Sequence, residues 1–295
     1  MKRQASGMAR KEAVAGWLFI SPWIAGFLIF AAGPIIASLA LSFSYWDAIT
    51  PPQFAGMANY RRLFSDPLLR RSLFNTVYYA VFAVPLGMCT ALGLALLLNQ
   101  KLRGMGIFRT LFYLPAVTSG VATYLLWMWL FNPQLGLINR FLRHFTSNPP
   151  LWLSSPDWAM PALIIMSLWG TGGAMLIFLA GLQNIPEQLY EAATIDGANN
   201  WKQFLHVTLP MLSPTIFFNL VMAVIGSFQV FSAAFVMTNG GPSNATLLYV
   251  LYLFQNAFMY FRLGYASAMA WLLFVIVLIL TLFQFRTSKR WVHYG

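Results

Sequence analysis

Residues 191–210 read EAATIDGANNWKQFLHVTLP, and this polar segment interrupts a chain that is otherwise built from long apolar stretches. Carboxylate, amide, lysine and histidine side chains are gathered here, between two long apolar runs. Glycine, asparagine and proline, which mark the ends of helices, recur within the segment. It therefore predicts a short, capped helical hairpin between two membrane-type segments, and this arrangement decides the fold class.

The first arm of the hairpin is predicted from its end signals. Asn184 can act as an N-cap, and Pro186 suits a first helical turn. Gly197 follows Asp196 and fits the left-handed position that ends many helices. One face of this helix would hold small and apolar side chains at helical spacing, namely Ile185, Leu189, Ala192 and Ala193.

A second helix is predicted directly after the turn. Asn199 or Asn200 would cap its start, and Pro210 and Pro214 are expected to break it before the next apolar segment. Its apolar stripe consists of Trp201, Phe204, Leu205 and Thr208. The hairpin, residues 184–213, could be a simple connector between two spans or a docking element for a soluble partner, and its physical features alone leave both open.

The composition places the chain among membrane proteins. Of its 295 residues, 59% are apolar and only 8% are charged, whereas soluble proteins average about 25% charged residues. The net charge of +11 would suggest nucleic-acid binding in a soluble protein, but here the cations lie in short tracts beside apolar segments, as topology signals do. We therefore expect membrane lipid, and no nucleic acid, around this chain.

Six segments are long enough to cross a bilayer, which requires about 20 apolar residues in a helix. They cover residues 13–43, 73–98, 110–131, 158–181, 214–237 and 263–285. Backbone groups in lipid must bond within their own segment, so helices are expected. The first segment exceeds a signal-peptide core and is interpreted as a retained span. The prediction is an all-α membrane protein with a tail at 1–12, a six-helix transmembrane domain at 13–285 and a tail at 286–295.

The distribution of positive charge favours a cytoplasmic location for both ends. With the N-terminus inside, eleven of the 18 Lys and Arg residues lie in cytoplasmic segments, in agreement with the positive-inside rule. Arg70 and Arg71 border the second span on the outside and oppose this orientation, but the basic tails and the 99–109 loop outweigh them. The hairpin is then cytoplasmic, and the loops at 44–72, 132–157 and 238–262 face outward.

No acid or histidine falls deep within a predicted span. All seven acids lie in tails, loops or span ends, although ion-driven transporters usually place a carboxylate or histidine within the membrane. A membrane transferase or metalloenzyme would need a catalytic or ligand cluster, and the sequence offers none. A phosphate-binding loop would read GxxxxGK[ST], yet none of the lysines follows a glycine. We expect no cofactor in this chain.

The hairpin carries a specific motif: E-A-A, three residues, G, nine residues, V, one residue and L-P. Its residues are Glu191, Ala192, Ala193, Gly197, Val207, Leu209 and Pro210. The pattern resembles the signature of permease subunits of ATP-binding-cassette importers, in which isoleucine stands at the position of Val207. The resemblance implies that the motif helix inserts into a groove of a cytoplasmic ATPase. It gives ATPase-coupling roles to Asp196 and to the motif residues other than Val207.

Four further stretches resemble the carbohydrate-uptake branch of that family. They are NYRRLFSDP at 59–67, FRTLFYLPAVTSGV at 108–121, NPQLGLINRFL at 132–142 and MTNGGPSNATLLYVLYLFQNAF at 237–258. The resemblance implies a subunit in a bacterial or archaeal cytoplasmic (inner) membrane. It would pair with a second, related permease, two copies of the ATPase and an extracytoplasmic solute-binding protein. ATP and Mg²⁺ would be bound in the ATPase, so this chain would be a transport subunit and not an enzyme.

The resemblance also suggests where a solute would pass. In the family, polar positions of the spans that flank the motif line the substrate path, which here gives Trp169, Thr171, Asn219, Ser227 and Gln229. Polar side chains in membrane helices often bond to neighbouring helices instead, so a packing role is the alternative. Since the spans contain no buried cation, a neutral, hydroxyl-rich solute is favoured there.

The sequence thus predicts the permease subunit of an ATP-driven importer for a sugar or sugar-like solute. An ion-coupled secondary transporter is the alternative, and the absence of acids from the spans argues against it. The sequence does not name the sugar, and glycerol-3-phosphate or another polar solute is also compatible with it.

The topology can be tested with reporter fusions. Because the sixth span separates Asn239 from Gly295, alkaline phosphatase should be active when fused at Asn239 and inactive when fused at Gly295. A cytoplasmic fluorescent reporter should give the reverse pattern. Activity of the same reporter at both positions would contradict the six-span topology.

Overall fold

The computed structural model describes residues 7–100 and 102–293. The chain forms two compact units, and α15 (Leu263–Ser288) contributes to both. One unit consists of the chain up to Ser65 with Gln255–Leu273, and the other of Asp66–Phe254 with the chain from Phe274 onward. The first six residues of the predicted N-terminal tail and the last two of the C-terminal tail lie outside the described residues.

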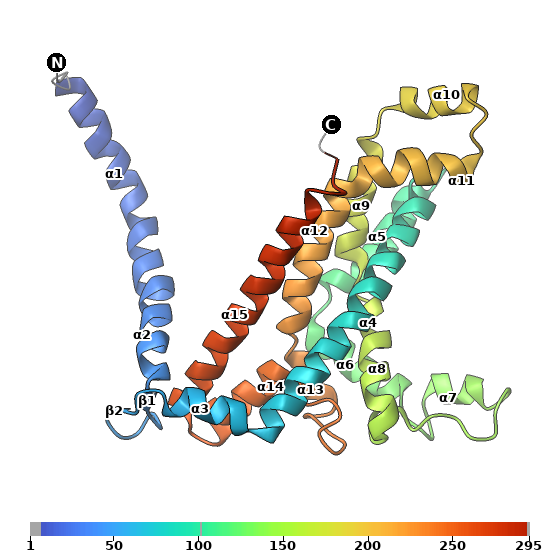
Figure 1. Ribbon diagram of the computed structural model, residues 1–295. Coiled ribbons are helices and arrows are strands. Elements are labelled where there is room, and N and C mark those ends of the chain that lie inside the picture. The colour runs from blue at the N-terminus through green and yellow to red at the C-terminus, as the bar shows by residue number, and fades with distance from the viewer. Residues whose placement is uncertain (1–6, 101, 294–295) are drawn as a thin grey trace. The chain divides into compact units, whose positions relative to one another are not determined.

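The first unit begins with a long apolar helix. α1 (Gly7–Phe27), the π turn η1 (Leu28–Ala32) and α2 (Gly33–Ser42) follow one another without a break (Figure 1). An antiparallel ribbon of β1 (Ser44–Tyr45) and β2 (Gln53–Phe54) comes next, then α3 (Ala58–Ser65). The π turn η4 (Gln255–Met259) and the first part of α15 complete the unit.

The π turn η1 explains how the long first helix accommodates Pro34. The Gly33 N–H bonds to the Leu28 carbonyl, five residues back instead of four. The next residue, Pro34, has no N–H, and its ring would collide with a carbonyl in a regular α-helical turn. Widening the turn by one residue relieves this collision. The predicted span at 13–43 is therefore one helix, which also extends further toward the N-terminus.

The second unit contains the remaining elements. Its long helix α4 (Pro67–Leu98) starts at Asp66, whose carboxylate accepts hydrogen bonds from the Leu68 and Leu69 N–H groups. The others are α5 (Met105–Val117), α6 (Gly120–Leu130), α7 (Leu137–Leu142), η2 (Trp152–Ser154), α8 (Pro156–Leu168), α9 (Gly172–Gln183), α10 (Glu187–Ile195), α11 (Asn200–Gln203), η3 (Phe204–Thr208), α12 (Leu209–Phe228), α13 (Ser232–Met237) and α14 (Tyr249–Phe254).

The described residues contain four helices that are long and apolar enough to cross a membrane singly: Ala9–Ser42, Pro67–Leu98, Asn200–Phe228 and Leu263–Ser288. Two bent pairs also qualify, α5 with α6 at 97° and α8 with α9 at 45°. Six spans result if each pair is one span, as the sequence predicts. The all-α membrane fold is confirmed, although the spans at 110–131 and 158–181 are broken and not continuous.

Both breaks have local causes. The chain between α5 and α6 is extended at Thr118, and α6 restarts at Gly120. The break between α8 and α9 lies in the glycine-rich run around Gly170 and Gly172. A Cβ at Gly172 would lie only 2.5 Å from the carbonyl oxygen of Phe112. The bend and the missing side chain together let α9 approach the backbone of α5.

The fifth span differs from its prediction at both ends. It was expected at 214–237, with Pro210 and Pro214 separating it from the hairpin, and this is wrong. One helical segment runs over Asn200–Phe228, because the π turn η3 bonds the Leu209 N–H to the Phe204 carbonyl and so accommodates Pro210. The helix ends at Phe228, and Ser232–Met237 forms the separate helix α13.

The core of the second unit lies where α4, α9 and α12 meet. Small residues of α4, Ala91 and Ala95, face bulky side chains of α9 such as Phe178 and Leu182. A Cβ at Gly181 would lie 2.6 Å from the Thr215 hydroxyl, so α9 and α12 are in close contact. Small residues at such contacts are typical of membrane helix packing. The three helices therefore form one tightly packed bundle.

Candidate functional site

The hairpin is formed by α10 and the start of the α11 segment, which Figure 1 shows side by side. The Gln203 side-chain amide joins the two arms, donating to the Thr194 hydroxyl at 2.9 Å and to the Ala198 carbonyl at 3.3 Å. Of the two predicted candidates, Asn199 caps the second arm by accepting from the Lys202 N–H at 2.9 Å. These bonds fix the relative position of the two arms.

The turn at Gly197 explains the spacing of the motif. The Gly197 N–H bonds to the Thr194 carbonyl at 3.0 Å, and the Ala198 N–H bonds to the Ala193 carbonyl at 2.9 Å. This pair of bonds is a Schellman motif, which requires a left-handed residue at the position of Gly197. Its φ is +76°, as predicted. Glycine must therefore follow the second motif alanine at this spacing for the helix to end in this turn.

The start of the first arm differs from its prediction. Asn184 does not cap α10, because its N–H bonds back to the Gly181 carbonyl at 3.2 Å and it ends α9. The Ile185 N–H likewise bonds to the Leu182 carbonyl at 3.4 Å. Helix α10 begins only after Pro186, which has no N–H to satisfy. Asn184 and Ile185 therefore donate their N–H groups to the last carbonyls of α9 and belong to the end of that helix, not to the start of α10.

The motif divides into an exposed tip and a root that contacts the core. The tip holds Glu191, Ala192, Asp196 and Gly197, all exposed. The root holds Val207, which packs against the core, followed by the half-buried pair Leu209 and Pro210. The position at which this chain departs from the family signature thus faces the interior, where valine and isoleucine differ by one buried methylene.

The root is anchored to the bundle by several side chains. Ile185 belongs to the buried cluster formed by α4, α9 and α12, and Tyr190 packs against the same cluster. The Tyr190 hydroxyl lies 3.0 Å from the Thr208 hydroxyl, within hydrogen-bond distance. The most exposed large apolar side chains of the hairpin are Ile195, at 87%, and Trp201, at 65%. The hairpin is therefore held firmly at its base and presents an apolar surface at its tip.

A cavity of about 210 Å³ lies between α4, α8, α9 and α12. It brings together three of the five predicted substrate-lining residues, Thr171, Asn219 and Ser227. Ser167 and Tyr79 also line it. Because these residues come from α4, α8, α12 and the break between α8 and α9, the tertiary structure gathers hydroxyl and amide groups that are far apart in the sequence.

The polar side chains of the cavity bond to their own helices. Thr171 donates to the Leu168 carbonyl at 2.9 Å, Ser227 donates to the Val224 carbonyl at 2.8 Å, and the Asn219 amide donates to the Thr215 carbonyl at 3.0 Å. Each oxygen keeps acceptor capacity after such a bond. The side chains can thus be accommodated without a ligand and still offer acceptors to one.

Trp169 and Gln229 lie outside this cavity. Trp169 stacks edge-to-face on Trp127 with ring centroids 6.1 Å apart, and it lines a second, largely apolar groove of about 900 Å³ that also includes Thr171. Gln229 ends α12 with an exposed side chain, and its N–H bonds to the Gly226 carbonyl at 3.1 Å. A substrate-lining role for these two residues is still a prediction.

Tyr79 is a cavity residue that the sequence analysis did not single out. It belongs to α4 and is only 6% exposed. It was not among the predicted substrate-lining residues because those lie on the spans that flank the motif, and α4 is distant from the motif in sequence. A tyrosine in the middle of an apolar span, following Asn75 and Thr76 on the same helix, was the available signal.

A helical membrane bundle that carries a capped, core-anchored hairpin with this motif defines a transport permease. The chain belongs to the family of binding-protein-dependent transport system inner membrane components, whose model matches residues 58–293. It is therefore a multi-pass inner-membrane component of a transport system. The recognition of an importer permease from the hairpin motif is confirmed.

Individual relatives agree with this assignment. The chain is 47% identical to the probable ABC transporter permease protein YesP of Bacillus subtilis (strain 168), covering 100% of this chain and 96% of that protein. It is 38% identical to the lactose transport system permease protein LacF of Rhizobium radiobacter, with 97% of each covered. A solved bacterial ABC transporter that imports the acidic polysaccharide alginate matches with 26% identity and a TM-score of 0.83, covering 95% of this chain and 98% of that one.

Replacement of Gly197 tests the origin of the hairpin turn. Gly197→Val should open the turn, because a side chain in the left-handed conformation costs about 1–2 kcal/mol. Hydrogen–deuterium exchange of the Gly197–Ala198 region should then accelerate about five- to thirtyfold. Gly106→Val is the control, since Gly106 has no neighbour within 4 Å and no left-handed backbone. Unchanged exchange in Gly197→Val would contradict the structural role of this glycine.

Proposed function

We propose that this chain is the transmembrane permease subunit of an ATP-driven importer for a sugar or sugar-like solute, in which closure of a separate ATPase drives alternating access. It would pair with a second, related permease and use two copies of the ATPase and an extracytoplasmic solute-binding protein. ATP and Mg²⁺ would be held by the ATPase. The lactose permease to which this chain is 38% identical over nearly its whole length supports the solute class.

The observation that carries this proposal is the physical continuity between hairpin and cavity. Tyr190 and Val207 of the hairpin pack on the buried cluster of α4, α9 and α12. Met88 and Ala174 pack on the same cluster and also line the cavity. Because packed interiors transmit displacement, a force on the hairpin would reach the cavity walls through this one cluster.

The α11–η3–α12 segment adds a direct connection. A single helical run, Asn200–Phe228, carries Trp201 on the exposed tip and Asn219 and Ser227 on the cavity wall. At 1.5 Å per residue, Trp201 and Asn219 are about 27 Å apart along the helix. Had Pro210 broken the helix, as the sequence suggested, the two ends could move independently. Because of the widened turn η3, Trp201 and Asn219 belong to one continuous helix and would move together.

The cavity chemistry supports a hydroxyl-rich solute. Its polar lining consists of hydroxyl and amide groups and includes no cation, carboxylate or histidine, which also disfavours the ion-coupled alternative. Its volume of about 210 Å³ is below the roughly 300–1,000 Å³ of typical ligand sites. In the proposed assembly the second permease would supply the opposite wall.

Docking of the ATPase can be tested by copurification of the complete importer through a tag on this chain. Ile195→Ser removes the most exposed apolar side chain of the tip, and Glu191→Lys reverses a charge there; each should lower the amount of ATPase recovered. Phe145→Ser is the matched control, because Phe145 is also highly exposed but belongs to a loop that is expected to face outward. Wild-type recovery in both tip variants would remove the docking role.

The solute path can be tested by uptake into vesicles that contain the complete importer. Asn219→Ala and Ser227→Ala should each lower solute affinity about three- to tenfold, because a buried hydrogen bond contributes about 0.5–1.5 kcal/mol. Thr110→Ala is the control, since Thr110 bonds to its own helix in the same manner but lies outside the cavity. A lower melting temperature with unchanged affinity would assign Asn219 and Ser227 to packing.

A further inference from the structure

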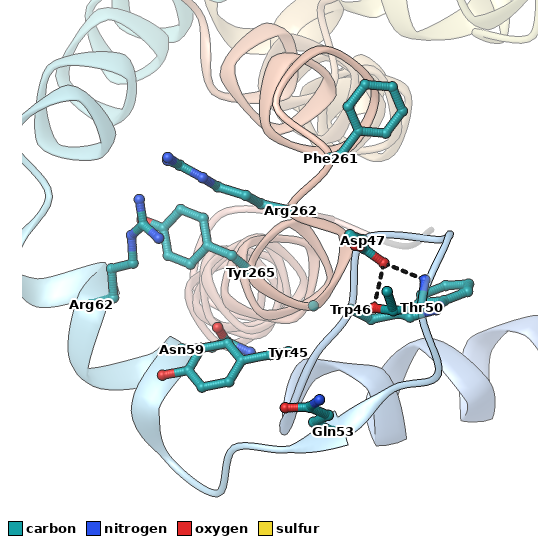
Figure 2. A pocket seen from close by; sticks show the side chains of 11 residues that line it. Tyr45, Trp46, Asp47, Thr50, Gln53, Asn59, Arg62, Phe261, Arg262 and Tyr265 are labelled. Atoms are coloured by element: carbon teal, nitrogen blue, oxygen red, sulfur yellow. Dashed lines mark hydrogen bonds between the residues drawn. The ribbon is translucent and has the colours of Figure 1, made fainter.

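A second polar pocket, of about 250 Å³, lies within the first unit. Its walls come from β1, the loop between β1 and β2, α3 and the start of α15, all segments that the charge distribution predicts at the outer side of the membrane. Figure 2 shows aromatic, amide and guanidinium side chains turned toward the same space. None of its lining residues belongs to the hairpin or to the membrane cavity.

The pocket is held in shape by backbone contacts. The Leu263 N–H bonds to the Trp46 carbonyl at 2.9 Å, which joins the start of α15 to the chain after β1. A Cβ at Gly264 would collide with the Ser44 carbonyl oxygen, so only glycine allows this approach. The Asn59 amide donates to the Ser42 and Ser44 carbonyls, both at 2.9 Å. The walls are therefore fixed before any ligand arrives.

One end of the pocket is cationic. The Arg62 guanidinium lies over the Tyr265 ring at 4.6 Å from the ring centre, and that of Arg262 lies 5.8 Å from the centre of Tyr260. Figure 2 shows both guanidinium groups at the same end. A guanidinium that stacks on a ring keeps its N–H groups at the edge, where they match a carboxylate. Two guanidinium groups at one end of the pocket therefore make that end suited to an anion.

The other end of the pocket offers groups for hydroxyls. Asp47 lies there with Thr50 (Figure 2), and its carboxylate accepts from the Thr50 N–H at 2.8 Å and hydroxyl at 2.9 Å. The Thr50 N–H bond in particular holds the pKa of Asp47 below its ordinary value, so it remains an acceptor at neutral pH. Gln53 and the exposed ring of Tyr45 also line the pocket.

We propose that this pocket binds one carboxylate-bearing ring of a saccharide, with the carboxylate between Arg62 and Arg262 and the ring hydroxyls toward Asp47 and Thr50. The inference rests on the proposed function for its solute class and outward-facing location. It adds a selection for negative charge that the membrane cavity, which has no cation in its lining, does not provide. The pocket volume suits a single ring, since drug-sized ligands need more than about 300 Å³.

The test compares D-glucuronate with D-glucose, which share a ring and differ in the carboxylate. The complete importer, in nanodiscs of neutral phosphatidylcholine, is titrated with each sugar by calorimetry. Glucuronate should bind about tenfold or more tightly than glucose, because charge-assisted hydrogen bonds are the stronger kind. Arg62→Gln and Arg262→Gln should each remove about tenfold or more of the glucuronate affinity and leave glucose binding unchanged.

Two further variants control for folding and for general charge. Arg61→Gln removes the neighbouring cation, which does not line the pocket, and should leave glucuronate binding intact. Arg62→Lys keeps the charge without the planar fork and should give an intermediate affinity. Melting temperatures of all variants should match the wild type.

Several results would overturn the inference: no glucuronate binding, equal affinity for both sugars, or an equal loss in Arg61→Gln and Arg62→Gln. If the arginine variants weaken binding of the solute-binding protein but not of glucuronate, the pocket is a protein-docking site instead. Uptake of a neutral sugar without glucuronate binding would overturn this inference alone. Glucuronate binding that depends on both arginines, without uptake of any sugar, would contradict the proposed function alone.

Discussion

Backbone hydrogen bonding in a medium without water constrains every part of this chain that crosses the membrane. Several prolines fall inside the apolar helices, where each removes a donor and crowds a carbonyl. Two of them, Pro34 and Pro210, lie just after a π turn. In both cases the preceding N–H bonds five residues back, in η1 and in η3. The second of these widened turns keeps the hairpin and the cavity wall in one helix, so the proposed coupling depends on it.

The hairpin motif combines two different physical requirements. At its tip, the spacing from Ala193 to Gly197 is that of a helix ending in a left-handed turn, which leaves the surrounding side chains exposed. At its root, Val207 packs on the bundle core. A docking element needs both, because an exposed surface that is not anchored could move without moving the membrane helices.

The two polar pockets differ in charge because one lies between apolar helices and the other in segments exposed to water. The cavity between the membrane helices is lined by hydroxyl and amide groups that bond to their own helices, since an unpaired charge is costly to bury there. The pocket of the first unit lies in segments outside the apolar core, where Arg62 and Arg262 remain exposed and keep their hydration. Selection by hydroxyl pattern and selection by charge would therefore take place in different parts of the chain.

The sequence by itself determined the local features of this protein: the six apolar segments, the left-handed Gly197, an asparagine cap at 199 or 200 and the hairpin motif. Each depends on neighbours within a few residues, as periodicity and end signals do. The tertiary structure decided that Pro210 and Pro214 do not interrupt their helix, where α5–α6 and α8–α9 bend, and which polar residues meet. Tyr79 joins Asn219 in a cavity, while Trp169 and Gln229 do not, because packing of α4 against α9 and α12 sets these distances and no local pattern records them.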